Sequence, residues 1–322
     1  MTVISATPIA TREGFGQALV ELGHRDERVV CVEADISKST RSCLFAQHFP
    51  ERFFNVGVAE QNAIGVGAGL ASCGLIPFVS TYAVFASMRA CEQVRTTVAY
   101  PRANVKICPS HGGLTPGSDG VTHQGTEDLG VMRTIPNMTV VMPCDFNQMR
   151  AAVFAAACHE GPVYIRGTRD AVPQLYDEHI LEDYEIGRAI KLREGDDVTI
   201  IAIGDMVSYS LEATEQLAAK GIEATVIDMH TLKPLDREAV IKSAERTGAV
   251  VTVEDHNIMN GLGSAVAELL VETLPVPMYR IGLRDTFGES GPYSLLLAKY
   301  GLATADVVRA SIDVLKRQKS GR

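Results

Sequence analysis

Short runs of valine and isoleucine alternate along this chain with longer stretches of helical periodicity, and this alternation limits the folds that it can adopt. A strand that is apolar along its whole length cannot leave one face in water, so such runs are typical of parallel sheets covered by helices on both faces. We therefore expect an α/β fold with two doubly wound domains. The expected strands are 28–35, 76–81, 104–110, 139–143, 163–167, 198–204, 224–230, 249–254 and 276–282, and the expected helices are 12–22, 60–73, 84–99, 147–157, 211–219, 237–245, 263–272 and 305–316.

A change of composition separates the two sets of strands. Residues 171–194 are acidic and punctuated by proline, which predicts a linker with little regular structure. The expected domains are then 1–170 and 195–322. A chain of 322 residues has a length that suits two domains better than one.

Composition also argues against several kinds of partner and site. The net charge is -9 and no run is rich in Lys or Arg, so a nucleic-acid surface is not expected. The longest apolar stretch, 63–71, is too short to cross a membrane, and the first ten residues do not resemble a secretory signal. Seven scattered cysteines without a C-x-x-C motif indicate buried free thiols in a reducing cytoplasm. No His/Cys cluster has the spacing of metal ligands, so no metal site is expected.

A glycine-rich segment begins at Glu60. A short strand is expected to end at Gly57, and Glu60 then opens a helix that contains Gly65, Gly67 and Gly69. The helix macrodipole alone favours a glutamate at this place, which is the plainest interpretation. The small residues of the helix would, in addition, let another backbone approach closely.

The loop 110–125 follows an expected strand and holds five glycines together with His111, Asp119 and His123. Rigid scaffolds often carry their polar binding residues on loops at the carboxyl ends of strands. An irregular loop with solvated histidines would have the same composition. The loop is therefore a candidate binding segment.

Upstream of this loop, Tyr82, Phe85 and Met88 share the i, i+3 spacing of one helix face. A hydrophobic stripe of this kind commonly belongs to the core. Its position directly after an expected strand also makes it a candidate ligand-binding face.

Taken in series, these segments resemble the transketolase and deoxyxylulose-phosphate synthase group. The run Asp119-Gly-Val-Thr-His-Gln124, followed by Pro136-Asn-Met138 and Pro143-Cys-Asp145, is similar to the D-G-x-T-H and P-N-M…P-x-D series of that group. The run Val56-Gly-Val-Ala-Glu60-Gln resembles its G-[IV]-x-E segment. The resemblance extends over nearly the whole chain and implies a thiamine pyrimidine-binding domain followed by a transketolase C-terminal domain.

The resemblance implies a site for thiamine diphosphate. Glu60 matches the catalytic glutamate that hydrogen-bonds N1′ of the aminopyrimidine and promotes ionisation of the cofactor. Tyr82 and Phe85 match aromatic positions that stack on the aminopyrimidine, and Met88 stands where many transketolases have tyrosine. Asp35 matches a segment near the cofactor.

The same resemblance implies a sugar site. His111 and His123 match catalytic histidines that meet the reacting end of the substrate, and Asp119 matches a residue that binds its hydroxyl groups. In the C-terminal domain, His230 and His256 are assigned structural roles.

Arg12, Ser39 and Arg169 fall where transketolase binds the distal phosphate of a sugar phosphate. Paired arginines suit a phosphate or a similar oxyanion. Arg166 competes with Arg169 for this role, and surface solvation is the alternative for these arginines.

One part of the family's machinery is missing from the sequence. The G-D-G…N motif, which holds the cofactor's diphosphate through Mg²⁺ or Ca²⁺, does not occur, and Gly204-Asp205-Met breaks the pattern at its third position. We therefore expect a split gene, with an N-terminal transketolase subunit as the partner in an α2β2 assembly that holds the metal ion. The expected substrates are sugar phosphates or related sugars.

Other interpretations remain at this level. The chain also has the plan of a β subunit of a 2-oxo-acid dehydrogenase, although the Asp119–Gln124 run favours transketolase. A split synthase with pyruvate as donor is a variant of the first interpretation. A non-catalytic regulatory subunit is the alternative from another class, and the sequence does not identify the donor and acceptor sugars.

Overall fold

The first lobe is built on a sheet in which the strands run parallel except at one edge. The structure is a computed structural model that describes residues 5–320, and within that range the strand order of this sheet is β12-β6-β7-β5-β4-β2-β3. Only β12 runs antiparallel to its neighbour. The strands are β2 (Val29–Glu33), β3 (Phe53–Asn55), β4 (Ile76–Ser80), β5 (Lys106–Ile107), β6 (Thr139–Val141), β7 (Val163–Ile165) and β12 (Thr231–Lys233).

Both faces of this sheet are covered, as the continuous apolar runs predict. Cys31 and Phe78 pack into a cluster with Leu19 of α1, whereas their neighbours Val32 and Val79 pack into a second cluster on the opposite face. Each strand therefore alternates between two buried cores. The helices of this lobe are α1 (Thr11–Arg25), α2 (Ser37–Thr40), α3 (Cys43–His48), α4 (Glu60–Ser72), α5 (Cys91–Gln93), α6 (Asp128–Thr134) and α7 (Phe146–Cys158), with 3-10 turns at Pro50–Arg52 and Gly117–Asp119.

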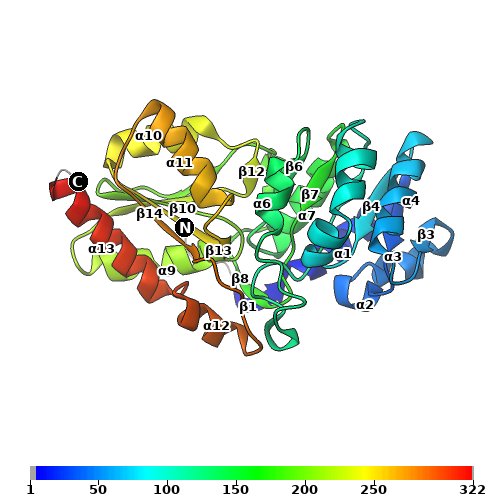
Figure 1. Cartoon of the computed structure of the whole chain (residues 1–322), viewed down its shortest axis with the longest axis horizontal. Coiled ribbons are helices and arrows are strands. Elements are labelled where there is room, and N and C mark those ends of the chain that lie inside the picture. Colours follow the sequence, from blue (N-terminus) through cyan, green and yellow to red (C-terminus); the bar gives the residue numbers. More distant parts are fainter. Residues whose placement is uncertain (1–4, 321–322) are drawn as a thin grey trace.

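The second lobe repeats this plan beside the first (Figure 1). Its strand order is β14-β13-β10-β11-β9, and β9 alone runs antiparallel to its neighbour. Helices α10 and α11 cover one face, and α9 and α13 cover the other (Figure 1). The elements are β9 (Ile190–Arg193), β10 (Val198–Ala202), β11 (Ala224–Asp228), β13 (Val250–Asn257), β14 (Met278–Leu283), α9 (Met206–Ala218), α10 (Arg237–Thr247), α11 (Leu262–Thr273), α12 (Tyr293–Tyr300) and α13 (Thr304–Ser320).

The predicted linker 171–194 is more regular than expected. It contains β8 (Ala171–Gln174), α8 (Ile180–Asp183) and β9. Strand β8 pairs with β1 (Ser5–Ala10), and β9 extends the sheet of the second lobe. Prolines and acidic residues do not prevent strand formation here because both strands lie at sheet edges, where an unpaired side can face water.

The two lobes are joined through their cores. Met142 of the first lobe belongs to the same buried cluster as Ile201, Met229 and Leu262 of the second. Strand β12 follows the second lobe's β11 in the chain but pairs with β6 of the first lobe. The lobes therefore form one packed unit.

The helix expected at 84–99 is wrong in its detail. The segment consists of a π-helix at Phe85–Arg89, the short α5 and a second π-helix at Val94–Ala99. A π-helix inserts an extra residue into each turn and changes which side chains share a face.

The expectation for the cysteines holds only in part. All seven are free, and Cys31, Cys108 and Cys144 are buried, but Cys73 and Cys158 are exposed. Across residues 5–320, no helix combines the length and apolar character that crossing a membrane requires.

Candidate active site

The candidate residues gather at one edge of the first sheet. Asp35 follows β2, Tyr82 follows β4, His111 follows β5 and Arg169 follows β7, while Glu60 opens α4 after β3. The carboxyl ends of parallel strands meet at the same edge, which is where open α/β sheets bind their ligands. Residues far apart in the sequence thus converge because of the sheet topology.

An aromatic cluster lies at the centre of this edge. The Tyr82 and His111 rings stack with centroids 3.9 Å apart, and the Phe85 ring centroid is 5.6 Å from that of Tyr82. The His123 ring meets Phe85 edge to face at 5.5 Å. The structure therefore brings the predicted cofactor side and the predicted sugar side into contact.

Met88 departs from the predicted stripe. Because Phe85–Arg89 is a π-helix, the i, i+3 spacing does not place Met88 on the face of Tyr82 and Phe85, and its side chain is 45% exposed. The next residue, Arg89, points to the site instead.

Glu60 is buried with its carboxylate paired to Arg89. Glu60 is 4% exposed, and Arg89 Nη1 donates to Glu60 Oε1 at 2.7 Å. The Arg89 guanidinium also lies over the Phe85 ring, 4.2 Å from its centroid. Among residues 5–320, no hydrogen bond reaches the second carboxylate oxygen of Glu60, so it can accept a further donor.

His111 is held in a constrained and uncharged state. Its backbone has a φ of 63°, and Nδ1 lies 2.8 Å from Ser110 Oγ. Burial, together with the positive charges of Arg12 and Arg169, lowers the pKa of His111 to about 3. His111 is therefore neutral near pH 7 and can act as a hydrogen-bond donor or acceptor.

Arg12 and Arg169 lie close enough to repel one another. Burial first, and then the charges of Arg41 and Arg169, lower the pKa of Arg12. Arg12 Nη1 donates to the Ser39 carbonyl oxygen at 3.0 Å, whereas its buried Nε has no hydrogen-bond partner among the described residues. The same Nε lies 4.0 Å from Glu13 Oε1, so the guanidinium is only partly satisfied, and two neighbouring guanidinium groups are suited to an anion.

The position of these arginines follows from the backbone around them. Thr168 N–H donates to Thr11 Oγ1 at 2.7 Å, which ties the start of α1 to the segment after β7. Arg169 donates to the carbonyl of Pro116 and lies 3.3 Å from Asp119 Oδ2. Asp119 is thereby held beside the guanidinium group of Arg169.

Asp35 lies on the exposed rim, and Arg166 lies outside the site. Asp35 accepts from Asn55 Nδ2 at 3.0 Å. Arg166 is fully buried, with its Nε 3.5 Å from Asp128 Oδ2, and does not reach the surface where a substrate would bind. Of the two competing arginines, only Arg169 borders the site.

His230 and His256 are both fully buried away from this edge. His256 Nε2 accepts the Gly130 N–H at 3.1 Å, and Nδ1 lies 2.6 Å from the Asn257 carbonyl. His230 packs against Tyr184 in a tilted arrangement, with ring centroids 4.3 Å apart. Their surroundings agree with structural roles.

Arg89 and Asp255 were not among the predicted site residues, and both acquire their contacts through tertiary structure. No cluster of three or more His, Cys, Asp or Glu side chains that could hold a metal ion occurs among the residues that the structure describes. The site offers the Glu60 carboxylate, the aromatic faces of Tyr82 and Phe85, and two neighbouring guanidinium groups, those of Arg12 and Arg169, that suit an anion.

Comparison with known proteins agrees with this arrangement. Residues 7–174 match the family described as transketolase, pyrimidine binding domain, and residues 187–307 match transketolase, C-terminal domain. The chain is 46% identical over 307 residues to the 6-deoxy-6-sulfo-D-fructose transketolase subunit SqwH of Clostridium sp. (strain MSTE9), covering 95% of each chain. It is 40% identical over 309 residues to an apulose-4-phosphate transketolase subunit of Phocaeicola vulgatus, covering 96% of this chain and 98% of the relative.

A solved structure is similar over the same length. The protein titled "Split gene transketolase, inactive beta4 tetramer" is 52% identical, superimposes with a TM-score of 0.90, and is matched over 96% of this chain and 99% of its own. The resemblance that the Asp119–Gln124 run indicated is thus confirmed. With its pyrimidine-binding and C-terminal domains, this chain belongs to the transketolase family.

Proposed function

We propose that this chain is the catalytic C-terminal subunit of a split transketolase, which transfers a two-carbon ketol unit from a ketose or its phosphate to an aldose or its phosphate. The observation that carries the proposal is the buried Glu60 carboxylate at the carboxyl edge of the sheet, which shares Arg89 as a partner with the Phe85 ring. A flat, protonated ring requires two contacts: a carboxylate that accepts its N–H and an aromatic side chain on which it can stack.

The contacts of Arg89 test whether the aminopyrimidine of thiamine diphosphate fits. Arg89 places a flat cation on Phe85 and donates a hydrogen bond to Glu60. A pyrimidine protonated at N1′ needs the same two partners, so Glu60 and Phe85 fit the group and Arg89 would have to leave. When bound, thiamine diphosphate supplies the nucleophilic carbon and the electron sink for carbon–carbon cleavage. Glu60 would hold the proton at N1′.

The sugar would lie against the loop 110–125. The neutral His111, together with His123 and Asp119, offers hydrogen bonds to hydroxyl and carbonyl oxygens. Arg12 and Arg169 would bind an anionic group at the far end of the sugar. The two relatives act, by their names, on a sulfonated and a phosphorylated sugar, and both anions suit paired guanidinium groups.

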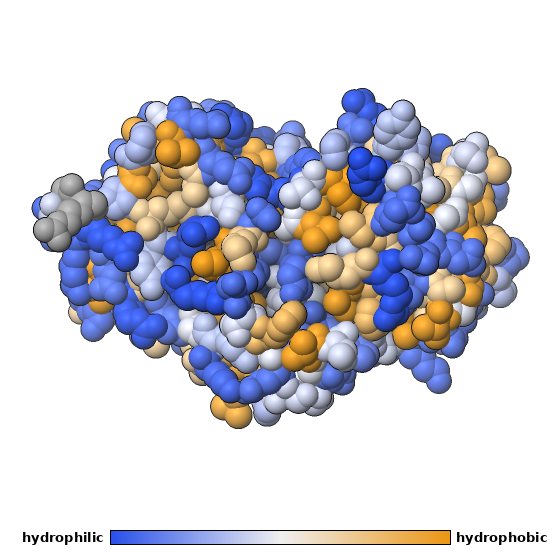
Figure 2. Space-filling view, in the orientation of Figure 1, coloured by the Kyte–Doolittle hydropathy of each residue, from blue (hydrophilic) through white to orange (hydrophobic). Residues whose placement is uncertain are grey.

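The diphosphate would be held by a partner subunit that carries the G-D-G…N motif and Mg²⁺ or Ca²⁺, in an α2β2 complex. A Cβ added at Gly65 or Gly69 of α4 would meet nothing within 4 Å, so the exposed face of this helix has open space at both glycines. Val58 and Tyr100 are exposed hydrophobic residues at 73% and 83%. In the view of Figure 2, hydrophobic residues are more frequent on the lobe that contains α4 than on the lobe that contains α13. A partner could cover this surface.

The test is reconstitution with the candidate partner subunit. We expect ketol transfer that needs both chains and thiamine diphosphate. Glu60→Gln should lower kcat by about 100-fold or more, the range of general acid–base contributions. Glu92→Gln, an exposed glutamate nearby on α5, is the matched control.

Three results would contradict the proposal. The first is full activity of the Glu60→Gln complex, which would favour a regulatory subunit. The second is activity of this chain alone. The third is decarboxylation of 2-oxo acids with a dye acceptor, which would favour the dehydrogenase β subunit.

A further inference from the structure

The loop 110–126 is largely buried although it contains little regular structure. Its one helical turn is Gly117–Asp119, and residues 111–117 and 124–126 are buried. Buried backbone groups outside helices and sheets need partners elsewhere. The first lobe supplies some of them, because the Gly112 N–H donates to Gly167 at 3.1 Å and the Gly113 N–H donates to Gly125 at 2.8 Å.

The second lobe supplies a further set of partners. The Leu114 N–H donates to both carboxylate oxygens of Asp255, at 3.1 and 2.9 Å. At the other end of the loop, the Asn257 N–H donates to the Thr126 carbonyl at 2.8 Å, and Gln124 Nε2 donates to the Glu289 carbonyl at 2.9 Å. The loop that carries His111, Asp119 and His123 is therefore held between the two lobes.

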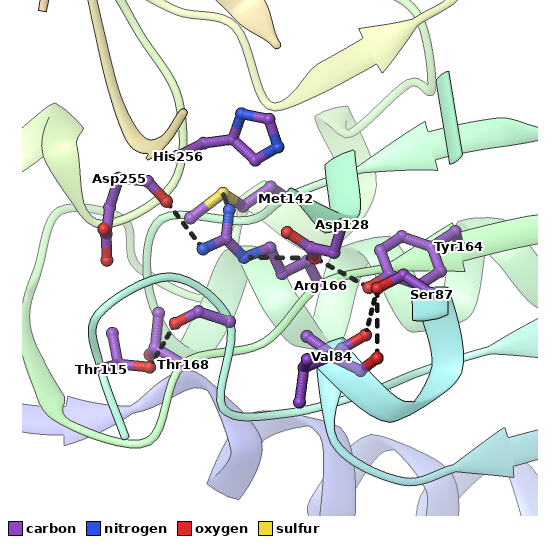
Figure 3. Close-up of polar contacts among 12 residues, drawn as sticks. Val84, Ser87, Thr115, Asp128, Met142, Tyr164, Arg166, Thr168, Asp255 and His256 are labelled. Carbon is purple, nitrogen blue, oxygen red and sulfur yellow. Dashed lines mark hydrogen bonds and ion pairs between the residues drawn. The ribbon is translucent and has the colours of Figure 1, made fainter. Parts of the chain in front are cut away.

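Asp255 is itself fixed in place. It is fully buried, Tyr293 donates its hydroxyl to Asp255 Oδ2 at 3.2 Å, and Arg166 Nη2 donates to the Asp255 carbonyl at 2.8 Å. Figure 3 shows the Arg166 guanidinium lying between Asp255, Met142 and Asp128. Because these contacts leave the Asp255 carboxylate few other positions, it can fix the backbone that it binds.

The backbone of the loop lies very close to Asp255 and Arg166. A Cβ at Gly113 would lie 2.1 Å from Asp255 Oδ2, and a Cβ at Gly112 would lie 1.8 Å from Arg166 Nε. Both contacts are far shorter than van der Waals separation. The glycines directly after His111 therefore allow the approach that the hydrogen bond to Asp255 requires.

We propose that Asp255 of the C-terminal domain is a positioning residue for sugar binding. By holding the Leu114 N–H, it keeps His111, three residues earlier, and the rest of the loop in the conformation that meets the substrate. The C-terminal domain then contributes to substrate recognition without touching the substrate. This inference deepens the proposed function and rests on it for its kinetic readout.

The kinetic test uses the reconstituted two-subunit complex. Asp255→Ala should raise the KM for the ketose donor by about tenfold, the order expected when a hydrogen bond to a charged group is lost. The half-saturating concentration of thiamine diphosphate should change less than the donor KM, because Glu60 and Phe85 lie on other segments and the loop is linked to the cofactor side through the ring contacts of His111 and His123. The matched control is Asp228→Ala, which removes another buried carboxylate, one bound by Gln148 and Tyr176 rather than by Tyr293 or the loop.

Amide hydrogen exchange of the isolated chain gives a readout that does not depend on activity. Residues 111–117 should exchange faster in Asp255→Ala and at the wild-type rate in Asp228→Ala. If Asp255→Ala does not fold, Tyr293→Phe takes its place, with an expected increase of about two- to threefold in donor KM and faster exchange in the same peptide.

The outcomes separate the two proposals. Wild-type donor KM and wild-type loop exchange in the Asp255 variant would overturn the positioning role, as would identical changes in the Asp228 control. A wild-type complex without ketol transfer would refute the proposed function, while the exchange experiment would still decide whether Asp255 holds the loop.

Discussion

Arg89 stands where the aminopyrimidine is proposed to bind, so removing its side chain should tighten cofactor binding. The guanidinium donates to Glu60 Oε1 at 2.7 Å and lies 4.2 Å from the Phe85 ring centroid. Both contacts must break before a pyrimidine makes them. Their combined free energy is therefore a cost of binding the cofactor.

The magnitude follows from the exposure of the pair. Glu60 is buried, but the Arg89 side chain is 51% exposed, so solvent screens the ion pair to about 1 kcal/mol or less. The cation–π contact adds about 0.5–1 kcal/mol. A total of about 0.5–2 kcal/mol corresponds to about a 2- to 30-fold lower half-saturating concentration of thiamine diphosphate in Arg89→Ala.

The assay is cofactor titration of the reconstituted complex, followed by initial rates of ketol transfer. The isolated Arg89→Ala chain should, in contrast, be less stable by about 1–2 kcal/mol, because a buried carboxylate loses its partner. Arg95→Ala removes an exposed arginine from the next π-helix and is the control. Unchanged or weaker cofactor binding in Arg89→Ala would refute the competition, and weaker binding would mean that Arg89 contacts the cofactor or the partner.

Three further predictions concern other parts of the chain. Gly65→Leu should leave the unfolding temperature of the isolated chain equal or higher, because α4 has open space at this position, yet weaken complex formation in sedimentation experiments; a complex of wild-type affinity would contradict this. Gly112→Ala should lower the free energy of unfolding by about 3 kcal/mol in urea titrations, since its Cβ would meet Arg166 at 1.8 Å, whereas Gly69→Ala should not. Burial raises the pKa of Asp228 to about 7, so the stability that its protonated form contributes is lost as pH rises from about 4 to about 7. Asp228→Asn should therefore reduce the fall in unfolding free energy between pH 5 and 8, and an equal fall in both proteins would contradict the assignment.

The strands that the sequence predicts are those whose own residues favour a buried strand. Strands β2, β4, β10 and β11 are mostly apolar, are buried along their whole length and lie inside their sheets. Strands β8, β9 and β12 are short edge strands that exist because a distant segment pairs with them. Local composition favoured a linker at the first two, and only the tertiary fold shows otherwise.

The candidate site likewise contains some residues that the sequence predicts and others that only the tertiary structure shows. Glu60, His111 and His123 lie in motifs, and the sheet topology brings their segments to one edge. Met88 and Arg89 could not be assigned from spacing, because a π-helix changes which of them turns toward Glu60. Asp255 lies 141 residues from Leu114, so no local pattern could relate them.

The contacts between the lobes explain why these two domains must act as one chain, although the diphosphate site can lie on another. Arg166 is a buried cation of the first lobe that donates to the second lobe's Asp255 carbonyl, and separating the lobes would leave it without this partner. Separation would also open the core shared by Met142 and Ile201 and remove β12 from its sheet. Separation would also take the Asp255 carboxylate away from the buried Leu114 N–H of the loop 110–126. The helix that Glu60 opens, in contrast, has an exposed face with open space at Gly65 and Gly69, so a partner chain that supplies the rest of the proposed cofactor site could approach it without disturbing either core.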